Sequence, residues 1–135
     1  MSFQIKTFEE YQEVYKKSVE NPEQFWGEIA DNFFWKRKWT NVLKWNFTEP
    51  EIKWFEGGKL NITENCLDRH IYKNGDTPAI IWEPNDPNEA HRILTYKQLL
   101  GKVEQFATVL KNNNIKKGDR VCIYLPMVPE LVIAV

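Results

Sequence analysis

The sequence predicts an α/β protein whose first part is a helical and irregular region of α+β type. Three observations carry this prediction: capping signals that mark several helices, two apolar runs typical of hairpin arms, and a continuous apolar β-run at 121–125. The 135 residues are 42% hydrophobic and 27% charged, which excludes a disordered tail, a collagen-like repeat and a coiled coil. A net charge of −1 is too balanced for a chain that mainly binds nucleic acid or anionic lipid.

Two helices are predicted at the start of the chain. Thr7 and Glu10 have the spacing of a capping box, and the residues after them place an apolar stripe on one face, so a helix is expected over Phe8–Glu20. Asn21 is a candidate N-cap for the next helix, with Pro22 in its first position and Gln24 placed to complete a second box. The apolar face of this second helix comprises Phe25, Trp26, Ile29, Ala30 and Phe33.

The tryptophan-rich stretch at 35–55 has weaker signals. Leu43, Trp45 and Phe47 alternate as in a short strand, but Pro50 interrupts the pattern, so irregular and well-packed structure is expected. A turn is predicted at 57–58, followed by renewed alternation at 60 and 62.

A third, short helix is predicted over 66–73. Asn65 would be its N-cap, and Asn74 and Gly75 would end it. The segments at 79–83 and Arg92–Thr95 then flank a turn-rich stretch and are expected to pair as a β-hairpin.

The last elements alternate between helix and strand. Thr95 and Gln98 form a third capping box, and an apolar face continues through 110 until the asparagine run at 112–114 stops the helix. After a turn at 117–119, the run at 121–125 predicts a strand buried on both faces. Pro129 and Glu130 are typical of the first turn of a further helix.

Helix, strand and helix form half of a βαβ crossover, and this half cannot cover both faces of the strand that it contains. The final helix also lacks a cap and a charged last turn. We therefore expect the chain to be truncated within a larger α/β domain, with exposed apolar surface at its last strand and helix, and with the remainder of the same polypeptide as its partner.

Three motifs resemble ligand sites without completing them. Gly57-Gly58-Lys59 lacks the frame of a phosphate loop, and we interpret it as a turn. Cys66 and His70 could share a helix face, but a zinc site needs further ligands and only Cys122 and His91 are of that kind. The cations and indoles at 35–39 would suit single-stranded nucleic acid, but packed indoles with lysines reaching solvent are the favoured interpretation.

The sequence also bears on location. No apolar run approaches the length that crosses a bilayer, and the first residues lack the apolar stretch of a secretory signal. The two cysteines form no CxxC pair and are expected to be reduced thiols, so a cytoplasmic protein with no membrane partner is predicted.

Several segments resemble the beginning of the acetyl-coenzyme A synthetase family of adenylate-forming enzymes. They are WFEGGKLNITENCLDRHI at 54–71, AIIWE at 79–83, ILTYKQL at 93–99 and KKGDRVCIYLPMVPELVIAV at 116–135. LTYxxL and KGDRV are shared across the superfamily, whereas GGKLN followed by NCLDRH points to acetyl-CoA synthetases and their propionyl-CoA relatives. The sequence departs mildly from the pattern at Glu64, where an aromatic is common, and at Gln98, where glutamate is usual.

The resemblance implies an N-terminal cap over 1–65 and the start of the AMP-binding large domain over 66–135: a first hairpin, helix and strand. For the full-length enzyme it implies acetate, ATP, CoA and Mg²⁺, with acetyl-adenylate as the intermediate. The family's phosphate loop, ribose aspartate, catalytic lysine and CoA arginines match no position here. No catalytic, cofactor-binding or metal residue is therefore assigned, and the isolated chain is expected to be inactive. A propionate-CoA ligase, a free-standing interaction protein and a nucleic-acid-binding domain are the alternatives.

Overall fold

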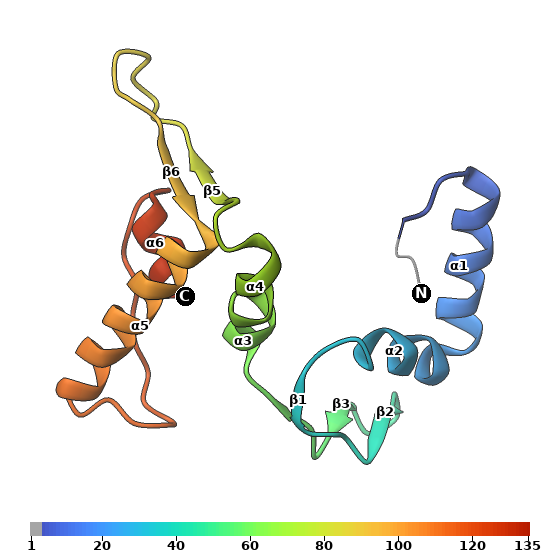
Figure 1. Ribbon diagram of the computed structural model, residues 1–135. Coiled ribbons are helices and arrows are strands. Elements are labelled where there is room, and N and C mark those ends of the chain that lie inside the picture. The colour runs from blue at the N-terminus through green and yellow to red at the C-terminus, as the bar shows by residue number, and fades with distance from the viewer. Residues whose placement is uncertain (1–3) are drawn as a thin grey trace. The chain divides into compact units, whose positions relative to one another are not determined.

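The computed structural model describes residues 4–135. This part of the chain consists of two compact units, unit 1 ending at Ile62 and unit 2 spanning Thr63–Val135. Helices and three small antiparallel sheets of two strands each make up both units (Figure 1). The mixture of helices and strands is as predicted. A parallel sheet, which the predicted α/β class would require, is not found among the described residues.

Unit 1 begins with α1, Phe8–Glu20, which has the predicted bounds. Thr7 caps it, because the Glu10 amide donates to the Thr7 Oγ1 at 3.1 Å. The other half of the predicted box is shifted by one residue, since the Glu10 carboxylate accepts from the Lys6 amide at 2.7 Å.

The second helix, α2, runs Pro22–Ala30 with proline in its first turn, as predicted. The predicted second box is wrong: the Asn21 side chain makes no capping bond, and the Gln24 amide donates to the Glu28 carboxylate at 3.0 Å. Asn21 also ends α1, where its N–H donates to the Lys17 carbonyl at 3.0 Å. One residue therefore serves two helix ends, and its backbone conformation is set by the end of α1.

The tryptophan-rich stretch is more regular than predicted. Strands β2, Asn41–Asn46, and β3, Glu51–Glu56, form an antiparallel hairpin, and β1, Trp35–Arg37, pairs with β4, Lys59–Leu60. The Asn46 side chain accepts from the Thr48 amide at 2.9 Å and closes a turn that includes Pro50. Phe47 therefore leaves the strand pattern and lies 85% exposed in the turn.

Unit 2 begins with three short helical segments instead of one helix at 66–73. These are α3, Ile62–Cys66, the 3-10 turn η1, Asp68–His70, and α4, Ile71–Asn74. The prediction of Asn65 as an N-cap is wrong, because Asn65 lies inside α3, is 5% exposed and accepts at Oδ1 from Arg69 at 3.2 Å. The helical path is interrupted at Leu67, whose φ of −119° departs from helix geometry.

The hairpin and long helix of unit 2 are confirmed. Strands β5, Pro78–Trp82, and β6, Arg92–Thr95, pair antiparallel. Helix α5, Tyr96–Asn112, begins with the predicted box: the Gln98 amide donates to Thr95 at 3.3 Å, and the Thr95 amide donates to the Gln98 side chain at 3.0 Å. Leu94 and Leu99 are buried and anchor the helix to the hairpin.

The predicted strand at 121–125 is not formed. This segment has neither helix nor strand structure, and its side chains are exposed. The physical reason is the lack of a neighbour, since β5 and β6 pair only with each other in the described chain. Helix α6, Pro129–Ala134, follows as predicted, with Pro129 fully buried in its first turn.

Candidate functional site

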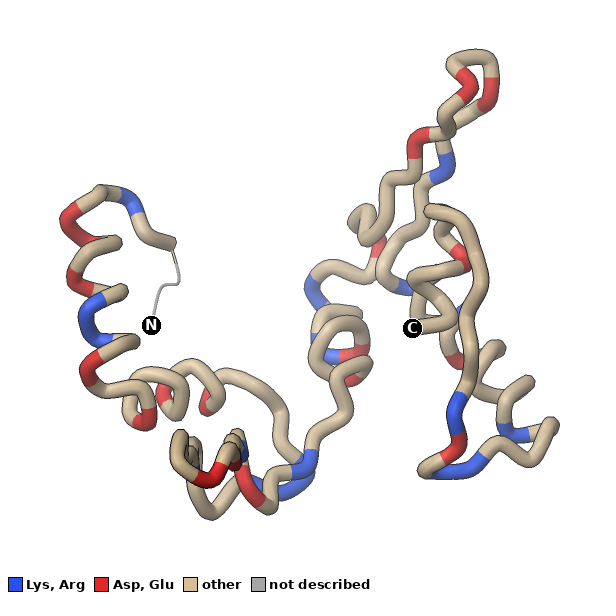
Figure 2. Tube along the Cα trace, turned by 180° about the vertical axis from the view of Figure 1, so that it is seen from behind, with Lys and Arg blue, Asp and Glu red and all other residues tan. Residues whose placement is uncertain are grey.

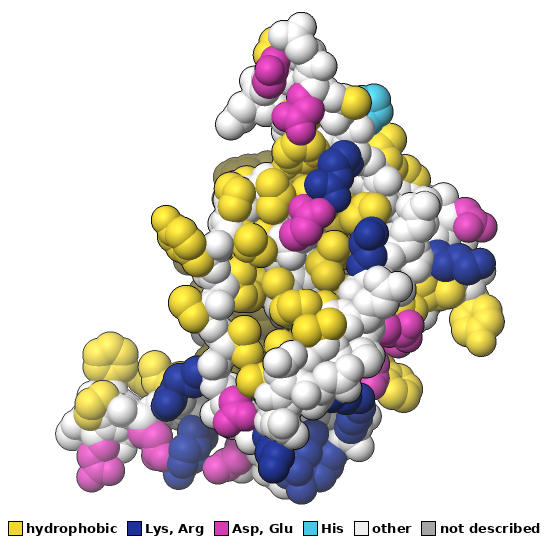
Figure 3. Space-filling model, turned by 90° about the vertical axis from the view of Figure 1, so that its left-hand side faces the viewer, with side chains coloured by type: hydrophobic (Ala, Val, Ile, Leu, Met, Phe, Trp, Pro, Cys, Tyr) yellow, Lys and Arg dark blue, Asp and Glu magenta, His cyan; other side chains and the backbone are white. Residues whose placement is uncertain are grey.

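The candidate functional site is a set of exposed apolar side chains on unit 2, carried by the hairpin, by the segment before α6 and by the end of the chain. It consists of exposed side chains from three places in the sequence: Ile81 and Ile93 on the hairpin, Val121, Ile123, Leu125 and Met127 in the irregular segment, and Val132 and Val135 at the end. Figure 3 shows apolar side chains gathered on one face, below a tip that carries acidic side chains. We call these eight residues the apolar surface. They offer no acid, base or nucleophile, so what they can do is bury area against another polypeptide surface.

Paired residues at the end of the hairpin tie the irregular segment to it. Trp82 and Arg92 are partners across β5 and β6. The Trp82 indole N–H donates to the Met127 carbonyl at 2.7 Å. The Arg92 guanidinium donates to both carboxylate oxygens of Glu130, at 2.5 and 3.3 Å, and lies 5.7 Å from the centre of the Trp82 ring.

The Arg92 hydrogen bond holds the pKa of Glu130 below its ordinary value, and the Glu130 hydrogen bond raises the pKa of Arg92. A glutamate in the first turn of a helix is further favoured in its charged form by the backbone N–H groups there. Glu130 is therefore ionised at neutral pH. Its carboxylate accepts two hydrogen bonds from Arg92, so we interpret the pair as a structural contact.

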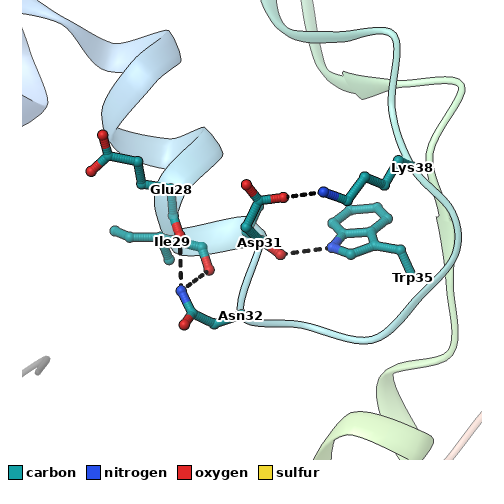
Figure 4. A network of polar contacts seen from close by, with 7 residues as sticks. Glu28, Ile29, Asp31, Asn32, Trp35 and Lys38 are labelled. Carbon is teal, nitrogen blue, oxygen red and sulfur yellow. Dashed lines mark hydrogen bonds and ion pairs between the residues drawn. The ribbon is translucent and has the colours of Figure 1, made fainter. Parts of the chain in front are cut away.

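Unit 1 carries a second feature, an aromatic cluster of Trp35, Trp39 and Phe55. The ring centres are 4.9 Å apart for the two indoles, and 5.5 and 5.3 Å from each indole to Phe55. The Trp35 indole N–H donates to the Ala30 carbonyl at 2.8 Å, so the end of α2 fixes the indole. Figure 4 shows the same helix end, where the Asn32 amide donates to the carbonyls of Glu28 and Ile29.

Two of the cations at 36–38, Arg37 and Lys38, have partners within unit 1. The Lys38 ammonium contacts the Asp31 carboxylate at 2.6 Å (Figure 4), and the Arg37 Nε donates to the Gly57 carbonyl at 2.7 Å. The indoles pack on one another and on Phe55 rather than forming an open platform for bases. Figure 2 shows acidic and basic residues interspersed along the trace. The geometry favours the packing interpretation.

The Gly57-Gly58-Lys59 motif is the predicted turn. Gly57 has a positive φ of 76°, and the Gly58 amide donates to the Phe55 carbonyl at 2.9 Å. A side chain at Gly58 would have its Cβ 2.7 Å from the Trp35 ring. The glycine is required by close packing, and its N–H is used within the turn.

The cysteine and histidine motif does not assemble either. Cys66 and Cys122 are free, exposed thiols, and the His70 ring lies 5.7 Å from that of Tyr96. Among residues 4–135 there is no group of three or more His, Cys, Asp or Glu side chains placed to bind a metal ion. In the same part of the chain, every helix is too short or too polar to span a membrane.

Two known protein families match this chain. Residues 67–135 match the family described as AMP-binding enzyme. The chain belongs to the AMP-binding enzyme family. Residues 11–66 match the family described as acetyl-coenzyme A synthetase N-terminus, so the resemblance found in the sequence is confirmed over nearly the whole chain.

Individual relatives of this AMP-binding chain agree. The acetyl-coenzyme A synthetase of Magnetococcus marinus is 50% identical over 127 residues, which cover 93% of this chain and 20% of the relative. That of Halorhodospira halophila is 49% identical over 128 residues, 94% of this chain and 20% of the relative. The solved structure of acetoacetyl-CoA synthetase from Streptomyces lividans matches with a TM-score of 0.77 and 28% identity, over 88% of this chain and 18% of that one. The chain thus spans about one fifth of these relatives' length.

Sequence reasoning missed the contacts of Trp82 and Arg92. Arg92 and Glu130 are 38 residues apart, and Trp82 and Met127 are 45 apart. Two features of the sequence are related to these contacts: Trp82 and Arg92 lie on opposite arms of the predicted hairpin, and the first turn of the last helix is acidic. Neither signal identifies the partner.

Proposed function

We propose that this chain is the N-terminal part of an AMP-forming acetate-CoA ligase. The supporting observation is about 50% identity to acetyl-coenzyme A synthetases over 93 to 94% of the chain. The full enzyme would join acetate to ATP to give acetyl-adenylate and pyrophosphate, and then transfer the acetyl group to the thiol of CoA. Its substrates would be acetate, CoA and ATP with Mg²⁺, in the cytoplasm.

Within that enzyme, residues 1–65 would act as a cap and residues 66–135 would begin the AMP-binding domain. The cap would bury stiff aromatic side chains against the catalytic body, which is an economical way to bury area because these side chains lose little conformational freedom. The apolar surface of unit 2 would be covered by the following polypeptide. This chain would supply position and stability, while the groups that bind ATP and move the acyl group would lie in the remaining four fifths.

A chimera tests this proposal. The 135 residues would replace the corresponding first fifth of the Magnetococcus marinus relative, and exchange of labelled pyrophosphate into ATP would be measured with acetate. We expect acetate-dependent exchange within about tenfold of that relative. The exchanged segment contributes no reacting group, so the substitution should affect the ground state and the transition state to a similar extent. A folded chimera without exchange would refute the assignment.

Sequencing the DNA beyond codon 135 tests the same proposal in the natural protein. Continuation into a Ser/Thr/Gly-rich segment supports a ligase, and a stop codon would support the free-standing interaction protein instead. A preference of the natural full-length enzyme for propionate over acetate would correct the acyl assignment while leaving the two-step reaction intact.

A further inference from the structure

The hairpin presents two side chains side by side toward the start of α6. Trp82 and Arg92 are cross-strand partners, and the Arg92 guanidinium lies 5.7 Å from the Trp82 ring. Cross-strand partners sit close together and move as one unit with their sheet. The pair is therefore a two-point attachment: one point is an indole N–H donor, and the other is a forked cation.

Both attachment points bind the chain within four residues of each other. Trp82 binds the Met127 carbonyl at 2.7 Å, and Arg92 binds the Glu130 carboxylate through two nitrogens. Pro129 lies between them, fully buried and fixed in φ by its ring. Two contacts on either side of a buried proline set both the position and the direction of the chain as it enters α6.

The other end of the irregular segment is anchored independently. The Ile115 amide donates to the Leu110 carbonyl at 3.1 Å, and the Lys116 amide donates to the Asp119 carboxylate at 2.6 Å. Residues 120–126 run between these anchors without a strand partner in the described chain. The segment that displays Val121, Ile123 and Leu125 is thus held at its ends and unpaired along its length.

We propose that Trp82, Arg92 and Glu130 form a latch that fixes the chain at 127–130, and with it the C-terminal end of the unpaired segment 120–127, before anything pairs with that segment. An unpaired strand can add to a sheet in several registers, and a shift of one residue turns its side chains to the opposite face. A segment fixed at both ends offers one register and loses less entropy on pairing. The proposal rests on the proposed function only for the identity of what pairs there, namely later strands of the same polypeptide.

The charges around the latch decide which substitutions are informative. Two cations lie near the Glu130 carboxylate: Arg92, which belongs to β6, and Lys102, which belongs to α5. Arg92 also interacts electrostatically with Glu89 in the hairpin loop. Lysine at position 92 would keep the charge but lose the two-pronged hydrogen bond. Arg92→Gln and Glu130→Gln each remove the ion pair, and the double variant R92Q/E130Q shows whether the two side chains act through the same contact.

The test is amide hydrogen exchange of the 135-residue chain, followed in peptides that cover 127–135 and α5. R92Q, E130Q and W82F should each speed exchange in 127–135 by about two- to fivefold, the range expected for one exposed contact, and leave α5 unchanged. The matched control E20Q breaks the exposed Lys16–Glu20 pair and should change neither peptide. The double variant R92Q/E130Q should speed exchange about as much as either single variant, because both substitutions remove the same contact.

Three outcomes would overturn the latch. They are unchanged exchange at 127–135 in R92Q and E130Q, equal acceleration across α5, and fully additive effects in R92Q/E130Q. None of these outcomes depends on enzymatic activity. Failure of the latch and failure of the acetate-CoA ligase assignment can therefore be told apart.

Discussion

Replacing Gly58 by alanine should destabilise unit 1 through a steric clash. The new Cβ would lie 2.7 Å from the Trp35 ring and 2.9 Å from the Phe55 carbonyl oxygen. The carbonyl belongs to the backbone, and the indole is held by its 2.8 Å hydrogen bond to Ala30, so neither neighbour can yield without breaking a contact. Overpacking of this kind costs about 1–3 kcal/mol.

Gly101→Ala is the matched control, since it makes the same chemical change in unit 2. Nothing lies within 4 Å of a Cβ at Gly101, which is inside α5. Alanine there should therefore stabilise the helix by roughly 0.5–1 kcal/mol. The two substitutions should thus change stability in opposite directions, although both add one methyl group.

Urea unfolding followed by tryptophan fluorescence measures the G58A effect. Five of the six tryptophans belong to unit 1: Trp26, Trp35, Trp39, Trp45 and Trp54. Fluorescence therefore reports mainly the unit that carries Gly58. A G58A free energy of unfolding within about 0.5 kcal/mol of the wild type would refute the packing argument for this turn.

Three further predictions concern unit 2. T95A should lose the Thr95 side-chain bond of the capping box at the start of α5, although the backbone N–H of residue 95 can still donate to Gln98. The loss should cost about 1 kcal/mol in thermal unfolding followed by circular dichroism, and an unchanged transition would contradict the cap. Because Arg92 lowers the pKa of Glu130, their contact should persist above the ordinary pKa of a glutamate and be lost as the pH falls through the lowered value. The Trp82 indole N–H resonance should report protonation of Glu130, which should start at higher pH in R92Q because the Arg92 hydrogen bond no longer lowers the pKa of Glu130. Identical titrations of the two proteins would refute this. I123K should reduce self-association of the 135-residue chain in sedimentation velocity, whereas Y72K, at an isolated exposed side chain, should not; equal effects would argue against the apolar surface.

Local signals in the sequence predicted the elements that depend on local contacts. The capping box at Thr95 and Gln98 predicted the start of α5, and Pro129 predicted the start of α6. The hairpin arms of unit 2 were predicted from β-rich runs around a turn-rich stretch. In each case the stabilising partner lies in the same element or in the adjacent arm.

The incorrect predictions concern residues whose structure depends on contacts far away in the sequence, or on a residue that two helices share. The run at 121–125 has the composition of a buried strand but finds no strand to pair with in the described chain. Asparagine is a residue type that often caps helices, yet Asn65 lies inside α3, where its side chain is buried and accepts a hydrogen bond from Arg69. Asn21 could not cap α2 because it also ends α1. The contacts of Trp82 and Arg92 with the start of α6 were invisible for the same reason, since they join residues about forty positions apart.

Exchange of labelled pyrophosphate into ATP, measured with acetate and the purified 135-residue chain alone, tests the central claim most directly. The account assigns the reacting groups to the other four fifths of the enzyme, so it predicts no exchange above a protein-free blank. The chimera with the Magnetococcus marinus relative serves as the positive control. Acetate-dependent exchange by the 135 residues alone would contradict the account.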